Sequence, residues 1–358
     1  MTREYQALFA LVRAGLWGRY DEAMASAFPL SLESWERVFA LARQQTVTGV
    51  AFRGLDFLPE EMAPSMGLIA KWMAYADRIE KGNRKVNSVL TGLCAHFAAS
   101  GTKVVLQKGP GVAAMYPEPY LREYGDLDLF FPDCDGEIDP MDGVPSAVKE
   151  ARPDSSWEYV VGGVIVERHT YLVDILSPRA KKYVARLISE KGFEEVCIDG
   201  CSILVPAPEV NLLLLSSHIL KHAFGVGVGL RQLCDMAVAC RYYSDRVDQA
   251  EMREIYRQAG LSKWSGLLEG FLTEFLGLEA AGNSEEKCMK KTRILLDIIL
   301  KGGNFGRFKG NEGFASERAM QKRLRTLESF LENTRFALAY APGEWLWTMA
   351  QLAGGRIR

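Results

Sequence analysis

The spacing of apolar side chains changes twice along the chain, and these changes constrain the fold more than any other feature. Residues 1–100 place apolar side chains three or four positions apart, which is typical of amphipathic helices. Residues 101–206 instead contain short alternating or apolar runs separated by Gly, Pro and Asp, which predicts strands and turns. Residues 207–358 return to helical spacing. The sequence therefore predicts an α+β fold, with a small mixed β-sheet flanked by N-terminal and C-terminal helical regions.

The helical regions contain several long amphipathic patterns. The longest covers about residues 64–99, and an earlier helix starts at a capping signal formed by Ser31 with Glu33 or Ser34. Cations gather on the polar face of the long helix: Lys71, Arg78, Lys81, Arg84 and Lys85. They form either a solvated face or one wall of an anion-binding cleft. Further helices are expected at 207–224, 230–243, 248–260, 290–303, 321–340 and after Pro342, with a Gly-rich loop at 301–314.

The middle block begins with two predicted strands, at residues 102–107 and 126–131. A Gly-rich turn and a short helix at 111–117 connect them. An acidic loop rich in Gly and Pro follows the second strand, and a helix is expected near Val144–Ala151.

The rest of the middle block predicts two antiparallel hairpins. They are expected to turn at Gly162-Gly163 and at Asp199-Gly200, because these residues favour tight turns. The segment between them, residues 177–191, has helical spacing.

Two acids mark the start of the predicted strand at 126–131. Asp126 and Asp128 are two positions apart, so a strand would place both carboxylates on the same face, with Leu127 on the opposite one. Neighbouring carboxylates repel each other, and a cation between them removes that repulsion. Oxygen ligands of this kind suit Mg²⁺. The alternative is a pair of solvated acids at a strand edge.

The turn before this strand contains Lys108, Gly109, Pro110 and Gly111. Backbone N–H groups at such a turn can contact phosphate, glycine allows close approach, and a lysine adds positive charge. The GxxxxGK[ST] signature is absent, so the turn is not a P-loop. A plain strand–turn–helix connection is the alternative.

A third acid is expected on a later strand. Glu167 and His169 are two positions apart and share a strand face, whereas Asp174, five residues further on, is a rival candidate. An ordinary surface strand would also explain Glu167.

This combination resembles the DNA polymerase beta-like nucleotidyltransferase superfamily, and most closely a bacterial group known as uncharacterised nucleotidyltransferases. The motifs that carry the resemblance occur in the same order: "LQKGPGVAAMYP", Arg122, "DLDLF", "VERH", "HILKH" and "LRQLCD". Two positions depart from the usual form. Gln107 replaces an apolar residue, and Glu167 stands where Asp is more common.

The resemblance implies roles for individual residues. Residues 101–206 would form the nucleotidyltransferase core, between helical regions at 1–100 and 207–358. Asp126, Asp128 and Glu167 would be catalytic and would bind two Mg²⁺ ions. The nucleotide would contact Lys108, Gly109, Gly111 and Arg122. Further residues would face the cleft: His169, Asp174, His218, His222, Arg231 and Asp235.

Some of these residues also have simpler explanations. Arg122 could pair with Glu118 or Glu123 instead of a phosphate. His218 and His222 are four positions apart on one helix face, a spacing that can bind a metal, but the Glu of an HExxH motif is missing. A hydrogen-bond network between two helices would explain the histidines equally well.

Charge and cysteine content limit the partners. The net charge is -2, which argues against long nucleic acids as substrates. The sequence contains no run of 18 apolar residues, so no membrane span is predicted. The seven scattered cysteines suggest reduced thiols in the cytoplasm. We expect a Mg²⁺-dependent transfer of a nucleoside monophosphate from an NTP to an unknown acceptor hydroxyl. The alternative is a catalytically inactive nucleotide-binding or regulatory protein with the same fold.

Overall fold

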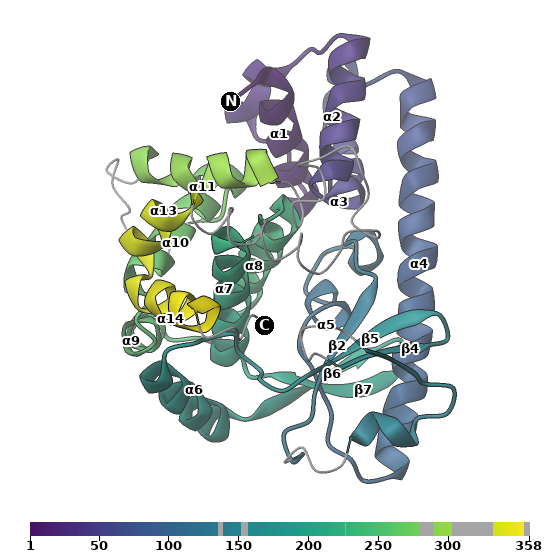
Figure 1. Cartoon of the computed structure of the whole chain (residues 1–358). Coiled ribbons are helices and arrows are strands. Elements are labelled where there is room, and N and C mark those ends of the chain that lie inside the picture. The colour runs from purple at the N-terminus through teal and green to yellow at the C-terminus, as the bar shows by residue number, and fades with distance from the viewer. Residues whose placement is uncertain (135–138, 152–156, 226, 280–288, 303–331, 354–358) are drawn as a thin grey trace.

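The computed structural model describes residues 1–134, 139–151, 157–225, 227–279, 289–302 and 332–353. Within these residues the chain forms thirteen α-helices and one seven-stranded mixed sheet. Helices precede and follow the sheet (Figure 1), so the predicted α+β fold is confirmed. The expected Gly-rich loop at 301–314 and the expected helix at 321–340 lie largely outside the described residues.

Four helices precede the sheet. They are α1 (Arg3–Trp17), α2 (Leu32–Gln44), α3 (Thr48–Leu55) and α4 (Met66–Ala99), with 3-10 turns η1 (Glu22–Ala27) and η2 (Glu60–Met62). The predicted cap of α2 is present, since the Ser31 side chain accepts a hydrogen bond from the Ser34 amide at 3.2 Å. Helices α1 and α3 cross closely, because a Cβ on Gly54 would lie 2.0 Å from the Leu11 carbonyl oxygen.

The sheet is built from strands that are distant in sequence. Its order is β3-β4-β5-β2-β1-β7-β6. The strands are β1 (Val105–Leu106), β2 (Asp126–Phe130), β3 (Val148–Ala151), β4 (Trp157–Val161), β5 (Val164–His169), β6 (Phe193–Ile198) and β7 (Cys201–Pro206). The pairs β2–β5 and β1–β7 are parallel, and the other neighbours are antiparallel. Both predicted hairpins, β4–β5 and β6–β7, are present.

The connections between strands are short helices and turns, apart from one longer helix. They are α5 (Pro110–Ala113), η3 (Pro119–Leu121), η4 (Pro140–Gly143) and α6 (Pro178–Lys191). The helix expected near Val144–Ala151 is not formed. Ser146 has a φ of +65°, which a helix does not allow, and the following residues form β3 by pairing with β4.

The lower half of helix α4, as drawn in Figure 1, covers one face of the sheet. Leu90, Leu93 and Phe97 pack there against Leu127 and Leu129 of β2. The cations on the exposed side of α4 pair with surface acids, such as Lys81 with Asp77 at 2.7 Å. On the opposite face of the sheet, Phe130 and Leu204 pack against the core that includes α6 and α7 (Pro208–Phe224).

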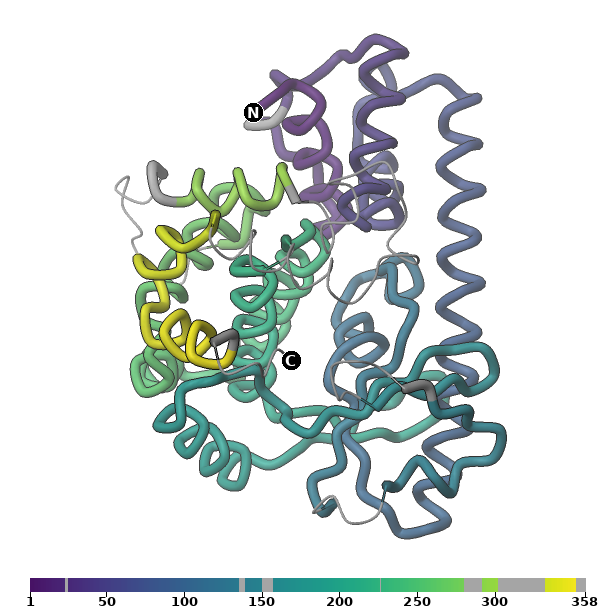
Figure 2. The backbone as a smooth tube through the Cα atoms, viewed as in Figure 1, coloured from purple at the N-terminus to yellow at the C-terminus, as the bar shows by residue number. Residues whose placement is uncertain are grey.

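Seven helices follow the sheet and complete the fold. They are α7 (Pro208–Phe224), α8 (Leu230–Tyr242), α9 (Gln249–Gln258), α10 (Ser262–Leu276), α11 (Met289–Gly302), α13 (Thr334–Tyr340) and α14 (Pro342–Ala353). Helix α13 lies beside α7, α10 and α14 (Figure 2). One hydrophobic core joins α1 and α2 to α7, α8 and α10, so the two helical regions pack on each other.

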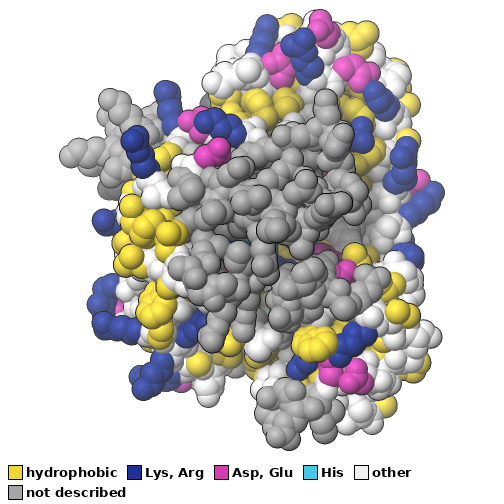
Figure 3. All heavy atoms as spheres, viewed as in Figure 1, with side chains coloured by type: hydrophobic (Ala, Val, Ile, Leu, Met, Phe, Trp, Pro, Cys, Tyr) yellow, Lys and Arg dark blue, Asp and Glu magenta, His cyan; other side chains and the backbone are white. Residues whose placement is uncertain are grey.

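The surface shown in Figure 3 carries charges of both signs. Lys and Arg side chains gather along the edge formed by α4 and around α6 and α9. Among the helices that the structure describes, none has the length and hydropathy of a membrane span. Six cysteines in the described chain are free thiols, and Cys288 lies outside it.

Candidate active site

Strand pairing brings the acidic residues of two motifs together. In the parallel pair of β2 and β5, Asp128 lies opposite Glu167. Residues two apart on a strand share a face, so Asp126 and Asp128 lie on the side opposite to Leu127, which is fully buried. The face of the sheet opposite α4 therefore carries the acids, as the sequence predicts.

Three side chains on this face could hold a metal ion. Ligand atoms of Asp128, Glu167 and His169 all lie within 4.8 Å of one another. His169 Nε2 is 2.6 Å from Asp128 Oδ1 and 3.7 Å from Glu167 Oε2. The Asp128 side chain is buried, whereas about a quarter of the Glu167 and His169 side chains is exposed. The group thus has a buried base and an edge that solvent or a ligand can reach.

Lys108 supplies positive charge to this group. Its Nζ atom is 3.3 Å from Asp128 Oδ1, and both side chains are largely buried. The backbone amide of the preceding Gln107 donates to the Asp128 carbonyl at 2.9 Å, which fixes the approach of the lysine. Burial alone would raise the pKa of Asp128, but Lys108 and the hydrogen bond with His169 lower it overall. Asp128 is therefore ionised at neutral pH.

The surroundings of Asp126 raise its pKa, whereas those of Asp128 lower the pKa of that residue. Burial and the negative charge of Asp128 raise its pKa, and the nearby cations Arg231 and Lys108 only partly offset these effects. Asp126 is not a member of the three-residue ligand group. A further cation near Asp126 would relieve the repulsion between the two aspartates.

The turn between β1 and α5 depends on a glycine. Gly109 has a φ of +59°, and a Cβ at this position would lie 3.2 Å from the Asp126 carbonyl oxygen. A side chain would both strain the backbone and press on the acidic strand. At Gly111 a Cβ would lie 3.2 Å from Val205 Cγ1, so packing against β7 is a sufficient reason for glycine there. Gly109 is the glycine that lies beside the acids.

The contacts of Arg122 match neither of the two roles expected from the sequence. Its guanidinium binds Asp235 with two hydrogen bonds, of 2.8 and 2.7 Å, and both side chains are buried. The Tyr116 hydroxyl also donates to Asp235, at 2.7 Å. The structure pairs Arg122 with neither Glu118 nor Glu123, and its donors are turned to Asp235 rather than to a phosphate. This cluster attaches α8 to the segment that enters β2.

Arg231 is the cation of α8 that lies near the acids. Its Nη1 atom donates to the Glu123 carbonyl at 2.7 Å, and its charge acts on Asp126. The Nε atom is buried and has no hydrogen-bond partner within the described chain. Burial and the charge of Arg122 lower the pKa of Arg231. Arg231 thus adds a second positive charge beside the acids.

The end of α7 contributes two histidines. The rings of His218 and His222 stack edge to face, with centroids 4.4 Å apart. Asp174 Oδ2 lies 3.1 Å from Lys221 Nζ and 4.0 Å from His218 Nδ1. Burial and the charge of Lys108 lower the pKa of His218 to about 4, so its ring is neutral at pH 7. The histidines pack beside the acids rather than joining their ligand group.

Comparison with known proteins decides the family. The family model of the uncharacterised nucleotidyltransferases matches residues 31–277, which is well over half of the chain. The chain belongs to this family. The match includes β1, β2, β5, α7 and α8, the elements that build the site.

A solved structure also resembles this nucleotidyltransferase family member. It is an antigenic nucleotidyltransferase-like protein from Paracoccidioides brasiliensis, with a TM-score of 0.37 and 12% sequence identity. The similarity covers 57% of this chain and 97% of the other. No curated protein matches the chain significantly.

The ligand group of this family member fits a divalent metal ion. Asp128 and Glu167 offer carboxylate oxygens on facing positions, which suit Mg²⁺ or Mn²⁺. The ring nitrogen of His169 suits transition metals better than Mg²⁺. In the described chain His169 already has a partner, Asp128, so the two carboxylates are the donors best placed for Mg²⁺.

Sequence reasoning placed most of these residues but not their contacts. It put His169 in the cleft rather than in the ligand group, although its place two residues after Glu167 gave a signal. It did not single out Lys221, which is the partner of Asp174. Nothing in the sequence indicated this contact, because α7 and the segment after β5 meet only in the folded chain.

Proposed function

We propose that this family member is a Mg²⁺-dependent nucleotidyltransferase, which transfers a nucleoside monophosphate from an NTP to an acceptor hydroxyl. The observation that carries the proposal is the position of Asp128 opposite Glu167, with Lys108 and the Gly109 turn on the same side. Membership of the family supports an NTP as the substrate. We expect the protein to act in the cytoplasm.

The residues have distinct roles in this proposal. Asp126, Asp128 and Glu167 would hold two Mg²⁺ ions, which neutralise phosphate charge and lower the pKa of the acceptor hydroxyl. Glu167, rather than Asp174, is the third carboxylate, because Asp174 is paired with Lys221 whereas Glu167 faces Asp128. Arg231 takes the phosphate-binding role first expected of Arg122, since Arg122 is bound to Asp235 whereas the charge of Arg231 acts on Asp126.

The transfer itself is an in-line displacement. The acceptor oxygen attacks the α-phosphorus, a new P–O bond forms, and the bond between the α-phosphorus and the bridging oxygen breaks. Pyrophosphate leaves with that electron pair, beside Lys108 and Arg231. The hydroxyl proton passes to solvent at the partly exposed edge formed by Glu167 and His169.

Labelled nucleotides test this proposal. The protein is incubated with Mg²⁺, cell extract and each NTP labelled at the α-phosphate, and labelled products are identified. Asp128→Asn should lower transfer by roughly 10²–10³-fold, because a group that stabilises the transition state is removed. Asp77→Asn, an exposed acid on α4, is the control and should transfer normally.

Two results would overturn the catalytic proposal. Transfer by Asp128→Asn at the rate of the wild-type protein would show that this site is not the catalytic one. Binding of Mg²⁺ and NTP by the wild-type protein without any transfer would favour the inactive nucleotide-binding alternative.

A further inference from the structure

A pocket of about 800 Å³ lies beside the ends of β2 and β5, the strands that carry the acids. Phe130 lines it and lies two positions after Asp128 on β2, so the two side chains share a face. Thr170 and Tyr171, which also line it, directly follow His169. Two residues of a strand span only about 7 Å, so the pocket begins next to the metal-ligand group.

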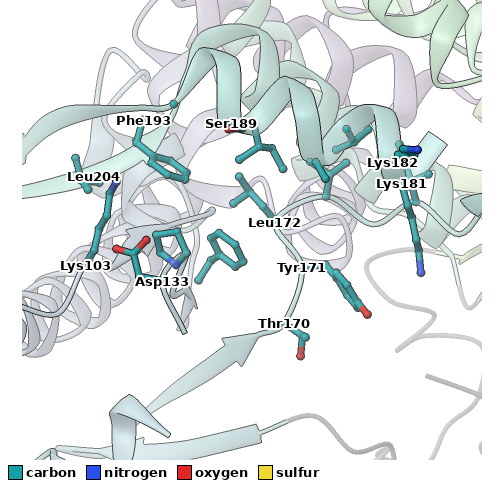
Figure 4. Close-up of a pocket in the computed structure, with 18 residues that line it drawn as sticks. Lys103, Asp133, Thr170, Tyr171, Leu172, Lys181, Lys182, Ser189, Phe193 and Leu204 are labelled. Atoms are coloured by element: carbon teal, nitrogen blue, oxygen red, sulfur yellow. The ribbon is translucent and has the colours of Figure 1, made fainter. Parts of the chain in front are cut away.

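The interior of this pocket is apolar and partly aromatic. It lies between α6 and the strand ends, as Figure 4 shows, and its apolar lining includes Phe130, Leu172, Val184, Ile188, Phe193 and Leu204. Volumes of several hundred cubic ångströms are typical of small-molecule sites. The pocket is therefore large enough for a molecule with a ring system or a branched apolar body.

The rim of the pocket is positively charged. Lys103, Lys181 and Lys182 line it, and Asp133 is the one acid among its described lining residues. Lys103 Nζ lies 5.1 Å from the centroid of the Phe193 ring, and Lys181 Nζ lies 5.0 Å from that of Tyr171. Lysines are thus held at both ends of the pocket (Figure 4). This charge favours a ligand with a carboxylate, sulfonate or phosphate group.

The position of the pocket agrees with in-line transfer. The Gly109 turn lies against Asp126, at the start of β2, whereas the pocket begins at Phe130, at its end. An in-line displacement needs the attacking and leaving groups on opposite sides of the α-phosphorus. With the pyrophosphate held near Lys108, an attacking hydroxyl would come from the Phe130 side.

We propose that this pocket binds the acceptor, a small organic anion with an apolar or aromatic body and a free hydroxyl. The hydroxyl points to Asp128 and Glu167, and the anionic group contacts Lys181 and Lys182. This inference rests on the proposed nucleotidyl transfer and adds the chemical class of its second substrate.

A charge-reversed variant and an aromatic anion test the pocket. The variant is Lys181→Glu/Lys182→Glu, and Arg253→Glu/Lys263→Glu, at exposed cations of α9 and α10 outside the pocket, is the matched control. The probe is anilinonaphthalene sulfonate, followed by its fluorescence. The wild-type protein and the control should bind it alike, and the double variant at least about tenfold more weakly, as expected for lost charge pairs. Equal binding by all three proteins would overturn the proposal.

Nucleotide assays separate this proposal from the proposed function. The double variant should bind Mg²⁺ and NTP in calorimetry like the wild-type protein, but should transfer label at least about tenfold more slowly when the cell extract is limiting. Normal transfer by the double variant would overturn the acceptor pocket alone. Loss of NTP binding in this variant would make the pocket a nucleotide site and would also overturn it. Absence of transfer by the wild-type protein would instead overturn the proposed function.

Discussion

Asp128 is the residue at which the contacts of the site converge. One carboxylate oxygen contacts both His169 and Lys108, and Glu167 lies opposite on β5. A buried carboxylate needs such partners, because an isolated ion loses its hydration. Lys108 therefore supplies the charge that a bound cation would also supply.

Lys108→Met should show that a bound cation can replace the positive charge of Lys108. Removing one partner of a buried ion pair typically costs about 3–5 kcal/mol, so the free energy of unfolding without divalent ions should fall by about that amount. Added Mg²⁺ should restore part of it, since the ion replaces the lost charge. Urea unfolding with and without Mg²⁺ measures both effects. Equal loss in the two conditions would contradict a cation site at Asp128.

His218 predicts a pH dependence of stability. Its pKa is lowered to about 4 in the folded chain, against about 6.5 when unfolded. Between these values the unfolded chain binds a proton that the folded chain does not, so stability falls as pH falls. The loss should approach about 3 kcal/mol by pH 4.

The variant His218→Asn should lack this part of the pH dependence. Urea unfolding from about pH 7.5 down to about pH 4.5 would measure the difference between the variant and the wild-type protein. His96→Asn, on α4, is the control. A constant difference at all pH values would contradict the role assigned to His218.

At the scale of elements, the buried Arg122–Asp235 pair joins α8 to the entrance of β2. Asp235→Asn should destabilise the protein by about 3–5 kcal/mol, because it leaves a buried guanidinium without its counterion. The double variant Arg122→Met/Asp235→Leu should recover part of this loss. Urea unfolding measures both. If Arg122→Met instead weakened NTP binding without loss of stability, the nucleotide role first expected of Arg122 would be right.

The sequence predicted elements well where local signals determine them. The length of α4 follows from its sustained helical spacing, and both hairpins follow from their turn residues. It failed at residues 144–151, where the chain forms β3. That strand exists because of its pairing with β4, with Val148 opposite Val160, and local spacing does not show such a partner.

The same limit applies to the candidate site. Asp126, Asp128 and Glu167 were predicted because period-two spacing and family motifs mark them, and the structure places Asp128 opposite Glu167. The partners of Arg122 and Asp174 were not found, since they come from α8 and α7, more than 40 residues away in sequence. Contacts between distant segments depend on how whole elements pack.

At the scale of the whole molecule, the helical regions are joined by specific contacts. Gln45 is buried, donates to the Ile299 carbonyl at 3.1 Å and accepts from the Leu230 amide at 2.9 Å. The Trp17 indole donates to the Leu276 carbonyl at 2.6 Å. These contacts join α8, α10 and α11 to the N-terminal helical region. The division of the chain into domains at residues 100 and 206 stays a prediction.

We propose that this assembled site binds divalent cations through Asp128 and Glu167. Electron paramagnetic resonance of Mn²⁺, with a non-hydrolysable NTP present, tests it most directly. The wild-type protein and Asp77→Asn should bind Mn²⁺ alike. Asp128→Asn and Glu167→Gln, shown to be folded by circular dichroism, should bind it at least about tenfold more weakly. Identical Mn²⁺ titrations of the wild-type protein and Asp128→Asn would contradict the account.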